Sequence, residues 1–180
     1  MTIELPDGLL TPRLVLRAPR MTDAVGIFNA YTQDAQVARH MVWRPHATLG
    51  ETEGFVTHCM QAWDDGRSRP YVLAFQDDHA VPIGMIEARV LAHSLDIGYV
   101  LARSYWGAGL MPEALTALTD AALALPNCFR VQATCDVNNL ASVRTLEKSG
   151  FQCEGRLERY VVLPNVSDEP GPCFMDARFR

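Results

Sequence analysis

The first clear alternation of apolar and polar residues is RLVLRA at residues 13–18, and this period of two predicts a β-strand. Further segments bounded by turn residues are interpreted as strands in the same way. Pro82 confines the start of one of them to an edge or a bulge. The predicted strands cover residues 13–18, 70–76, 81–90, 95–102, 129–136, 152–162 and 173–180. We therefore expect a mixed sheet of about seven strands.

A helical period of three to four residues appears between these strands. The predicted helices cover residues 21–33, 48–65, 110–125 and 138–150. The apolar residues of the third helix step by four and three, which predicts one buried face. That face consists of Met111, Leu115, Leu118, Ala122 and Leu125.

Capping residues mark the ends of three of these helices. Thr22 or Asp23 is expected near the N-cap of the first. Thr48 and Glu51 have the spacing of a capping box before the second. Gly150 closes the last one as a C-terminal cap.

The order of the elements indicates a mixed α/β fold in which hairpins come first and one strand–helix–strand crossover follows. The sequence has 180 residues and shows no internal repeat, low-complexity tract or linker. We expect residues 1–180 to form one domain.

Composition narrows the class of protein. Hydrophobic residues make up 48% and charged residues 21%, as in ordinary globular domains, and the formal net charge of −5 argues against a nucleic-acid-binding face. The five cysteines include no CxxC pair, which favours reduced thiols. Neither a membrane-spanning apolar run nor a signal-peptide pattern is present, so we expect a cytoplasmic protein without a membrane partner.

The stretch SYWGAGLMPEAL, residues 104–115, precedes the third predicted helix. Gly107 and Gly109 remove side chains that would keep an anion from the backbone, and the N–H groups of a helix start attract negative charge. Pro112 is expected at the first helical position, and Glu113 complements the helix dipole. The pattern fits either a phosphate-binding loop or a plain tight turn before a helix. It matches neither the Rossmann fingerprint nor the P-loop.

Three segments in this order resemble the GNAT superfamily of acyl-CoA N-acyltransferases. They are IGYVLARSYWGAGLMPEAL, VQATCDVNNLASVRTLEKSGF and EGRLERY. The segments LLTPRLVLRAPRMTDA and WRPHATLGETEGFV are similar to the RimJ/RimL-type branch of ribosomal-protein N-terminal acetyltransferases. The resemblance covers nearly the whole chain and resolves the glycine stretch in favour of a phosphate loop.

The resemblance implies a twisted mixed sheet with helices on both faces and two central strands, 95–102 and 129–136, that splay apart. The pantetheine arm of acetyl-CoA would lie in the gap, and the pyrophosphate would rest on the loop N–H groups. The broader superfamily has Gln or Arg at Trp106 and Gly or Ala at Met111, but backbone donors do not depend on these side chains. The implied cofactor-binding residues are Tyr99, Val100, Leu101, Trp106, Gly107, Ala108, Gly109, Leu110, Met111, Asn139 and Ser142.

Asn139, Ser142 and Leu146 share one helix face because they are three and four residues apart. The resemblance places this face toward the thioester and gives Asn139 a hydrogen bond to the pantetheine arm. Many superfamily members have a tyrosine acid at position 146, where this chain has leucine. The branch has serine at position 142, so Ser142 is expected to contact the departing thiolate. The alternative is that Ser142 only caps or packs the helix.

The implied reaction is direct attack of a neutral amine on the thioester, with the carbonyl polarised by backbone N–H groups of the strand that carries Tyr99 and Val100. Glu87 and Asp96 lie on neighbouring strands, so either is a candidate base, the alternative being an ordinary exposed carboxylate. The histidines show no metal-ligand spacing and no metal is expected, although the branch draws its acceptor site from the loop that carries His46.

The sequence thus predicts an acetyl-CoA-dependent N-acetyltransferase that acts on a protein N-terminal amine. The alternatives are a small amine acceptor, such as a polyamine, an amino acid or an aminoglycoside, and a non-catalytic CoA-binding module. A nucleotide-binding protein is disfavoured because Pro112 and the missing lysine do not fit its loops. Either a monomer or a homodimer is compatible with the sequence.

Overall fold

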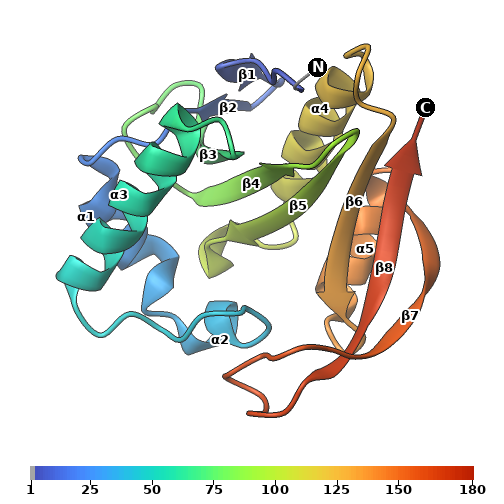
Figure 1. Ribbon diagram of the computed structural model, residues 1–180. Helices are drawn as coiled ribbons and strands as arrows, with labels where there is room; N and C mark the ends of the chain where they lie inside the picture. Colours follow the sequence, from blue (N-terminus) through green and yellow to red (C-terminus); the bar gives the residue numbers. More distant parts are fainter. Residues whose placement is uncertain (1–2) are drawn as a thin grey trace.

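The computed structural model describes residues 3–180, which contain an eight-stranded mixed sheet (Figure 1). The strand order is β1-β2-β3-β4-β5-β6-β8-β7, and only β5 and β6 pair in parallel. The strands are β1 (Gly8–Leu10), β2 (Leu14–Arg17), β3 (Ser68–Phe75), β4 (Gly84–Val90), β5 (Ser94–Leu101), β6 (Arg130–Asp136), β7 (Gln152–Val161) and β8 (Gly171–Phe179). The predicted mixed fold with early hairpins is confirmed.

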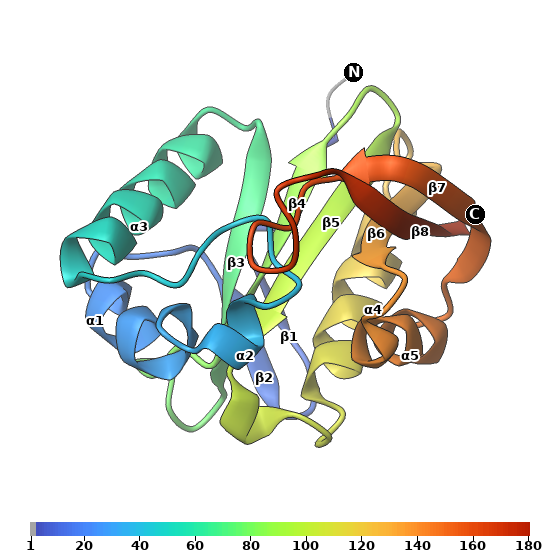
Figure 2. The same ribbon diagram turned by 90° about the horizontal axis from the view of Figure 1, so that it is seen from below.

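Helices cover both faces of this sheet. They are α1 (Asp23–Ile27), α2 (Ala35–Ala38), α3 (Leu49–Asp64), α4 (Leu110–Leu123) and α5 (Leu140–Lys148), with a π-helical turn η1 (Phe28–Thr32) and a 3₁₀ turn η2 (Arg103–Tyr105). Figure 2 shows α1, α2 and α3 on one side and α4 and α5 on the other. No helix among the described residues is both long and apolar enough to cross a bilayer.

The predicted face of α4 forms part of the main core. Met111, Leu115, Leu118 and Ala122 are all buried there, packed with strand residues from β3 to β6. Leu125 lies beyond the end of the helix and is only partly buried. The periodicity therefore identified the buried face and overestimated the length of the helix.

The start of α3 also follows the prediction closely. The Thr48 hydroxyl accepts a hydrogen bond from the N–H of Glu51 at 3.4 Å. The Glu51 carboxylate accepts from the N–H of Ala47 at 2.8 Å, one residue before the position that a capping box uses.

The prediction for the first helix was right about its start and wrong about its length. Residues 21–33 form the short helix α1 followed by η1, and Thr22 is the N-cap residue, although its side chain makes no capping hydrogen bond. The carboxylate of Asp23 is buried and pairs with Arg17 at 2.6 Å, so a tertiary ion pair holds the start of this helix.

Two short elements, β1 and α2, were not predicted. They contain three and four residues, too few for either period to be recognised. The sheet consequently has one strand more than expected.

The crossover from β5 through α4 to β6 creates the central gap. Parallel pairing runs from Ser94–Arg130 to Ile97–Ala133 and then stops. Beyond it β5 pairs only with β4, and β6 pairs only with β8. Figures 1 and 2 show the two strands diverging from this point. The predicted splay of the central strands is confirmed.

Candidate active site

The loop between β5 and α4 presents free backbone N–H groups. Gly107 and Gly109 have φ values of +78° and +74°, which glycine adopts without strain. Within the described part of the chain, the N–H groups of residues 107–111 have no hydrogen-bond acceptor. These donors at a helix start fit an anion such as a pyrophosphate.

One detail of this loop differs from the prediction. The helix α4 begins at Leu110, so Pro112 is its third residue and not its first. The N–H that proline lacks still falls in the first turn, where the helix offers no acceptor.

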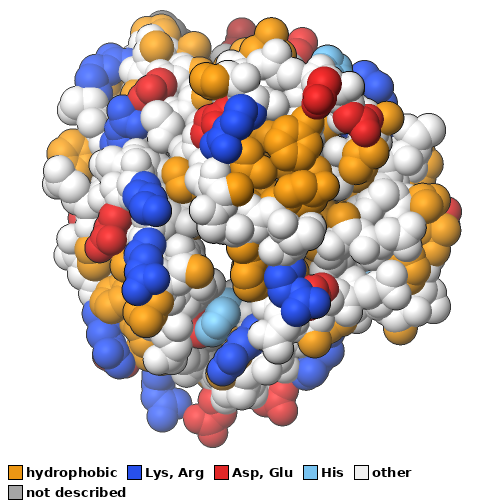
Figure 3. All heavy atoms as spheres, turned by 180° about the vertical axis from the view of Figure 1, so that it is seen from behind, with side chains coloured by type: hydrophobic (Ala, Val, Ile, Leu, Met, Phe, Trp, Pro, Cys, Tyr) orange, Lys and Arg blue, Asp and Glu red, His pale blue; other side chains and the backbone are white. Residues whose placement is uncertain are grey.

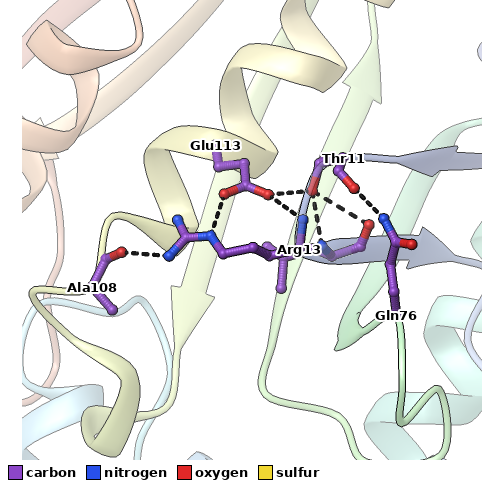
Figure 4. Close-up of polar contacts among 6 residues, drawn as sticks. Thr11, Arg13, Gln76, Ala108 and Glu113 are labelled. Atoms are coloured by element: carbon purple, nitrogen blue, oxygen red, sulfur yellow. Dashed lines mark hydrogen bonds and ion pairs between the residues drawn. The ribbon is translucent and has the colours of Figure 1, made fainter.

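Arg13, just before β2, fastens this loop to the edge of the sheet (Figure 4). Its Nε donates to the Glu113 carboxylate at 2.6 Å, and its Nη1 donates to the carbonyl of Ala108 at 2.9 Å. The hydroxyl of Thr11 donates to the same carboxylate at 2.5 Å, and Gln76 donates to the carbonyl of Thr11. The guanidinium therefore holds the loop in shape and adds positive charge beside the free N–H groups.

Trp106 connects the loop to the end of β5. Its Nε1 donates to the carbonyl of Leu101 at 2.8 Å, while 49% of the residue remains exposed. The Leu101 carbonyl is thus already paired within the protein.

Tyr99 and Ser142 meet across the gap. The hydroxyl oxygens of Tyr99 on β5 and Ser142 on α5 are 2.7 Å apart. Burial raises the pKa of Tyr99 above its ordinary value, against the opposing effect of the Ser142 hydrogen bond, so the phenol stays protonated. Asn139 caps α5 by accepting from the N–H of Ser142 at 3.2 Å, which leaves its side-chain NH₂ as a free donor.

The two predicted base candidates are both engaged by Arg89. Asp96 accepts from Nε at 2.9 Å and from Nη2 at 2.7 Å of that arginine. Glu87 accepts from Nη1 of Arg89 at 2.9 Å and from the hydroxyl of Ser68 at 2.8 Å. Asp96 also pairs in register with Gln132, in the part of β5 and β6 that has not yet separated.

Two groups near the gap were missed in the sequence. Arg13 lies 95 residues from Ala108, and His40 lies 96 residues from Asp136, with which it pairs at 2.7 Å. No local pattern signals either contact.

The gap opens to the surface. Figure 3 shows an opening near the middle of the molecule, bordered by hydrophobic, cationic and histidine side chains. Within residues 3–180, no group of three His, Cys, Asp or Glu side chains is arranged to hold a metal ion.

Comparisons with known proteins agree with this geometry. The family model described as an acetyltransferase (GNAT) domain matches residues 13–152. The uncharacterised N-acetyltransferase p20 of Bacillus licheniformis is 26% identical over 86% of this chain and 87% of its own length.

Two solved structures resemble the whole chain. The microcin C7 self-immunity acetyltransferase MccE, in complex with acetyl-CoA and AMP, has a TM-score of 0.85 and 19% identity, covering 97% of each chain. The ribosomal L7/L12 α-N-protein acetyltransferase RimL, in complex with coenzyme A, has a TM-score of 0.81 and 20% identity, covering 99% of this chain and 98% of its own. Because the family model spans most of the sequence, the chain belongs to the GNAT acetyltransferases and is an N-acetyltransferase.

Proposed function

We propose that this enzyme transfers an acetyl group from acetyl-CoA to the α-amine of a protein N-terminus. The observation that carries the donor assignment is the row of free N–H groups at residues 107–111, held by Arg13 at the start of α4. A pyrophosphate on these donors would direct the pantetheine arm into the gap between β5 and β6. The free NH₂ group of Asn139 lies at the start of α5, where it would donate to that arm.

The gap also offers the groups that acyl transfer needs. Beyond Ile97 the edge of β5 that faces β6 has no strand partner, and a backbone N–H of the Tyr99–Val100 segment on that edge would polarise the thioester carbonyl toward attack. The Tyr99 and Ser142 hydroxyls would donate hydrogen bonds to the departing thiolate. Since a free thiol has a pKa of about 8.5, the leaving group needs only modest stabilisation at neutral pH.

The preference for an α-amine rests on proton chemistry and on the likeness to RimL. An α-amine with a pKa near 8 is about one-tenth neutral at pH 7, whereas a lysine amine is less than about one-thousandth neutral. A small-molecule amine is the second candidate, supported by the likeness to the spermidine N-acetyltransferase of Vibrio cholerae in complex with CoA and spermine, with a TM-score of 0.75 and 18% identity.

The donor site is tested by Gly107→Asp with Gly107→Asn as its matched control. A side chain at this position meets no protein atom within 4 Å, and both residues tolerate positive φ better than most. We expect Gly107→Asp to weaken CoA binding at least about tenfold relative to Gly107→Asn, because only the former adds negative charge beside the pyrophosphate. Calorimetric titration with CoA measures this ratio, and equal affinities for the two variants would contradict the loop assignment.

The acceptor is tested by thiol release from acetyl-CoA. Peptides with free N-termini, the same peptides with blocked N-termini and polyamines form the panel. Turnover only with free N-termini is the expected result. Turnover only with polyamines or other small amines would replace the α-amine acceptor by the second candidate.

A further inference from the structure

His40 and Asp136 form an isolated pair beside the gap. The Nδ1 of His40 lies 2.7 Å from the Oδ2 of Asp136. The side chains are 18% and 5% exposed, so the pair is shielded without being sealed from solvent. It brings the segment after α2 against the end of β6.

The hydrogen bonds of Asp136 define which ring nitrogen of His40 is available. The second oxygen of Asp136 accepts from the backbone N–H of Asn138 at 3.0 Å and from its side-chain NH₂ at 3.3 Å. A carboxylate that accepts on both oxygens requires Nδ1 of the histidine to donate. The neutral ring then presents the lone pair of Nε2, for which no protein partner exists among residues 3–180.

Strand register places this pair at the level of the thioester. The last pair between β5 and β6 is Ile97–Ala133, and three residues further along each strand lie Val100 and Asp136. These two residues therefore stand on opposite walls of the gap and point to the same face of the sheet. Val100 packs against a cluster of apolar residues that includes Ile27 of α1 and Val56 of α3. The shared face is therefore the one that α1 to α3 cover.

The acid and base sides of the gap are consequently separated. Tyr99 alternates with Val100 along β5 and points to the opposite face, where it meets Ser142 on α5. The loop of residues 107–111 begins α4 on that same face. A donor entering beside α4 would leave the face with His40 open to the acceptor.

The segment that carries His40 is held in place. The side-chain NH₂ of Asn165, between β7 and β8, donates to the carbonyls of Ala38 and Trp43 at 2.7 Å each. Figure 2 shows this β7–β8 connection running beside α2. The two bonds flank His40 in the sequence, so they fix the backbone on both sides of it.

The carboxylates on the same face are worse placed to take a proton. Glu87 pairs in register with Gly98, which lies about 7 Å along β5 from Val100. Its carboxylate also forms an ion pair with Arg89. Asp96 lies about 13 Å from Val100 along the strand and is bound by the same arginine. Among residues 3–180, His40 has no cationic partner.

We propose that His40 is the general base of the acetyl transfer and that Asp136 is its positioning residue. This proposal rests on the proposed function. The ammonium group of the acceptor gives one proton to Nε2 of His40, and its nitrogen then forms a bond to the thioester carbon. As the C–S bond breaks, the second proton leaves the nitrogen and the thiolate becomes the thiol of CoA. His40 returns its proton to solvent.

Other ionisable groups lie on the segments that carry or adjoin the pair and enter its pH behaviour. They are Arg39 and Arg44 on the segment of His40, Asp168 on the β7–β8 connection and Cys173, which pairs in register with Asp136, on β8. Arg44 and Asp168 pair with each other at 3.3 Å and are exposed. Burial and the nearby Asp136 raise the pKa of the Cys173 thiol above its ordinary value.

The test compares His40→Gln, Asp136→Asn and the control His93→Gln on a turn at the far end of β5. For each variant, kcat/KM for a free-N-terminus peptide is measured from pH 6 to pH 9.5, together with the calorimetric affinity for CoA. We expect His40→Gln to lose about 100-fold at pH 7 and to approach the wild-type rate at high pH, where the amine is already neutral. Asp136→Asn loses less, and CoA affinity stays unchanged.

A second variant guards against a structural effect. In His40→Ala, added imidazole is expected to restore part of the turnover without changing CoA affinity. A wild-type pH profile in His40→Gln, or an equal loss at every pH without imidazole rescue, would overturn the base assignment. The same holds if only His46→Gln changes the profile. If the wild-type enzyme binds CoA but acetylates no amine, the proposed function itself fails, and the base assignment with it.

Discussion

Two hydroxyl groups meet at one edge of the gap, whereas Leu146, where many superfamily members have a tyrosine, is completely buried. The phenol of Tyr99 thus comes from a strand and not from the helix that carries Ser142. A raised phenol pKa, caused by burial, makes Tyr99 a hydrogen-bond donor at neutral pH. Under the proposed function, this pair would supply the donor that position 146 lacks.

We predict that Tyr99→Phe lowers kcat about tenfold while the KM for acetyl-CoA changes little, because the hydrogen bond strengthens only as charge reaches the sulfur. Ser142→Ala should have a similar effect, and the double variant should lose less than the product of both. Steady-state kinetics provide the measurement, with Tyr160→Phe at an exposed position as the control. Fully multiplicative losses would mean that the two hydroxyls act independently.

At the scale of elements, the start of α4 is held by hydrogen bonds to residues near the N-terminus of the chain. Glu113 accepts hydrogen bonds from Thr11, from the Arg13 side chain and from the Arg13 backbone N–H. Burial alone would raise the pKa of Glu113, but these bonds and the charge of Arg13 outweigh it and lower the pKa below 4.5. The carboxylate form of Glu113 therefore ties α4 to the start of β2.

A lowered carboxyl pKa contributes stability that is present above the unfolded-state value and is lost as the pH falls through the folded-state value. We predict that Glu113→Gln costs about 1 kcal/mol of unfolding free energy at pH 7. The difference from wild type should shrink between about pH 5 and pH 3. Urea unfolding across this range measures it. Glu158→Gln, whose carboxylate pairs only with the exposed Arg156, is the control. A difference that is constant with pH would exclude ionisation as the cause.

Elements long enough to repeat their period several times were predictable from the sequence. Contacts between elements far apart in the sequence were not. The buried face of α4 and the glycine loop follow from local periodicity and from backbone preferences. By contrast, β1 and α2 are too short to show a period. The buried ion pair of Asp23 with Arg17 has no local signal either. The pairs of Arg13 with Ala108 and of His40 with Asp136 arise only when the sheet is assembled.

At the scale of the whole molecule, the splayed strands give one gap with two sides. The loop before α4 and the Tyr99–Ser142 pair belong to the side of α4 and α5, and His40, in the segment after α2, belongs to the side of α1 to α3. Figure 2 shows these two groups of helices on opposite sides. Donor and acceptor can therefore occupy the gap together. This arrangement favours direct transfer over an acetylated enzyme.

The state of the Cys135 thiol also argues against a covalent intermediate on this residue. Cys135 is buried beside the gap, and burial, with a further contribution from the charge of Asp176, raises the pKa of its thiol to about 12. Such a thiol carries almost no thiolate at neutral pH, and thiolate is the reactive form.

We therefore predict sequential kinetics, with intersecting lines when acetyl-CoA and a peptide acceptor are varied together. Cys135→Ala should keep at least about one-third of the wild-type kcat, since its thiol takes no part in the transfer. Mass spectrometry of enzyme quenched with acid after mixing with acetyl-CoA alone should show no added acetyl group. Parallel lines together with an acetyl group on Cys135 would require a two-step transfer and would remove the need for both substrates to share the gap.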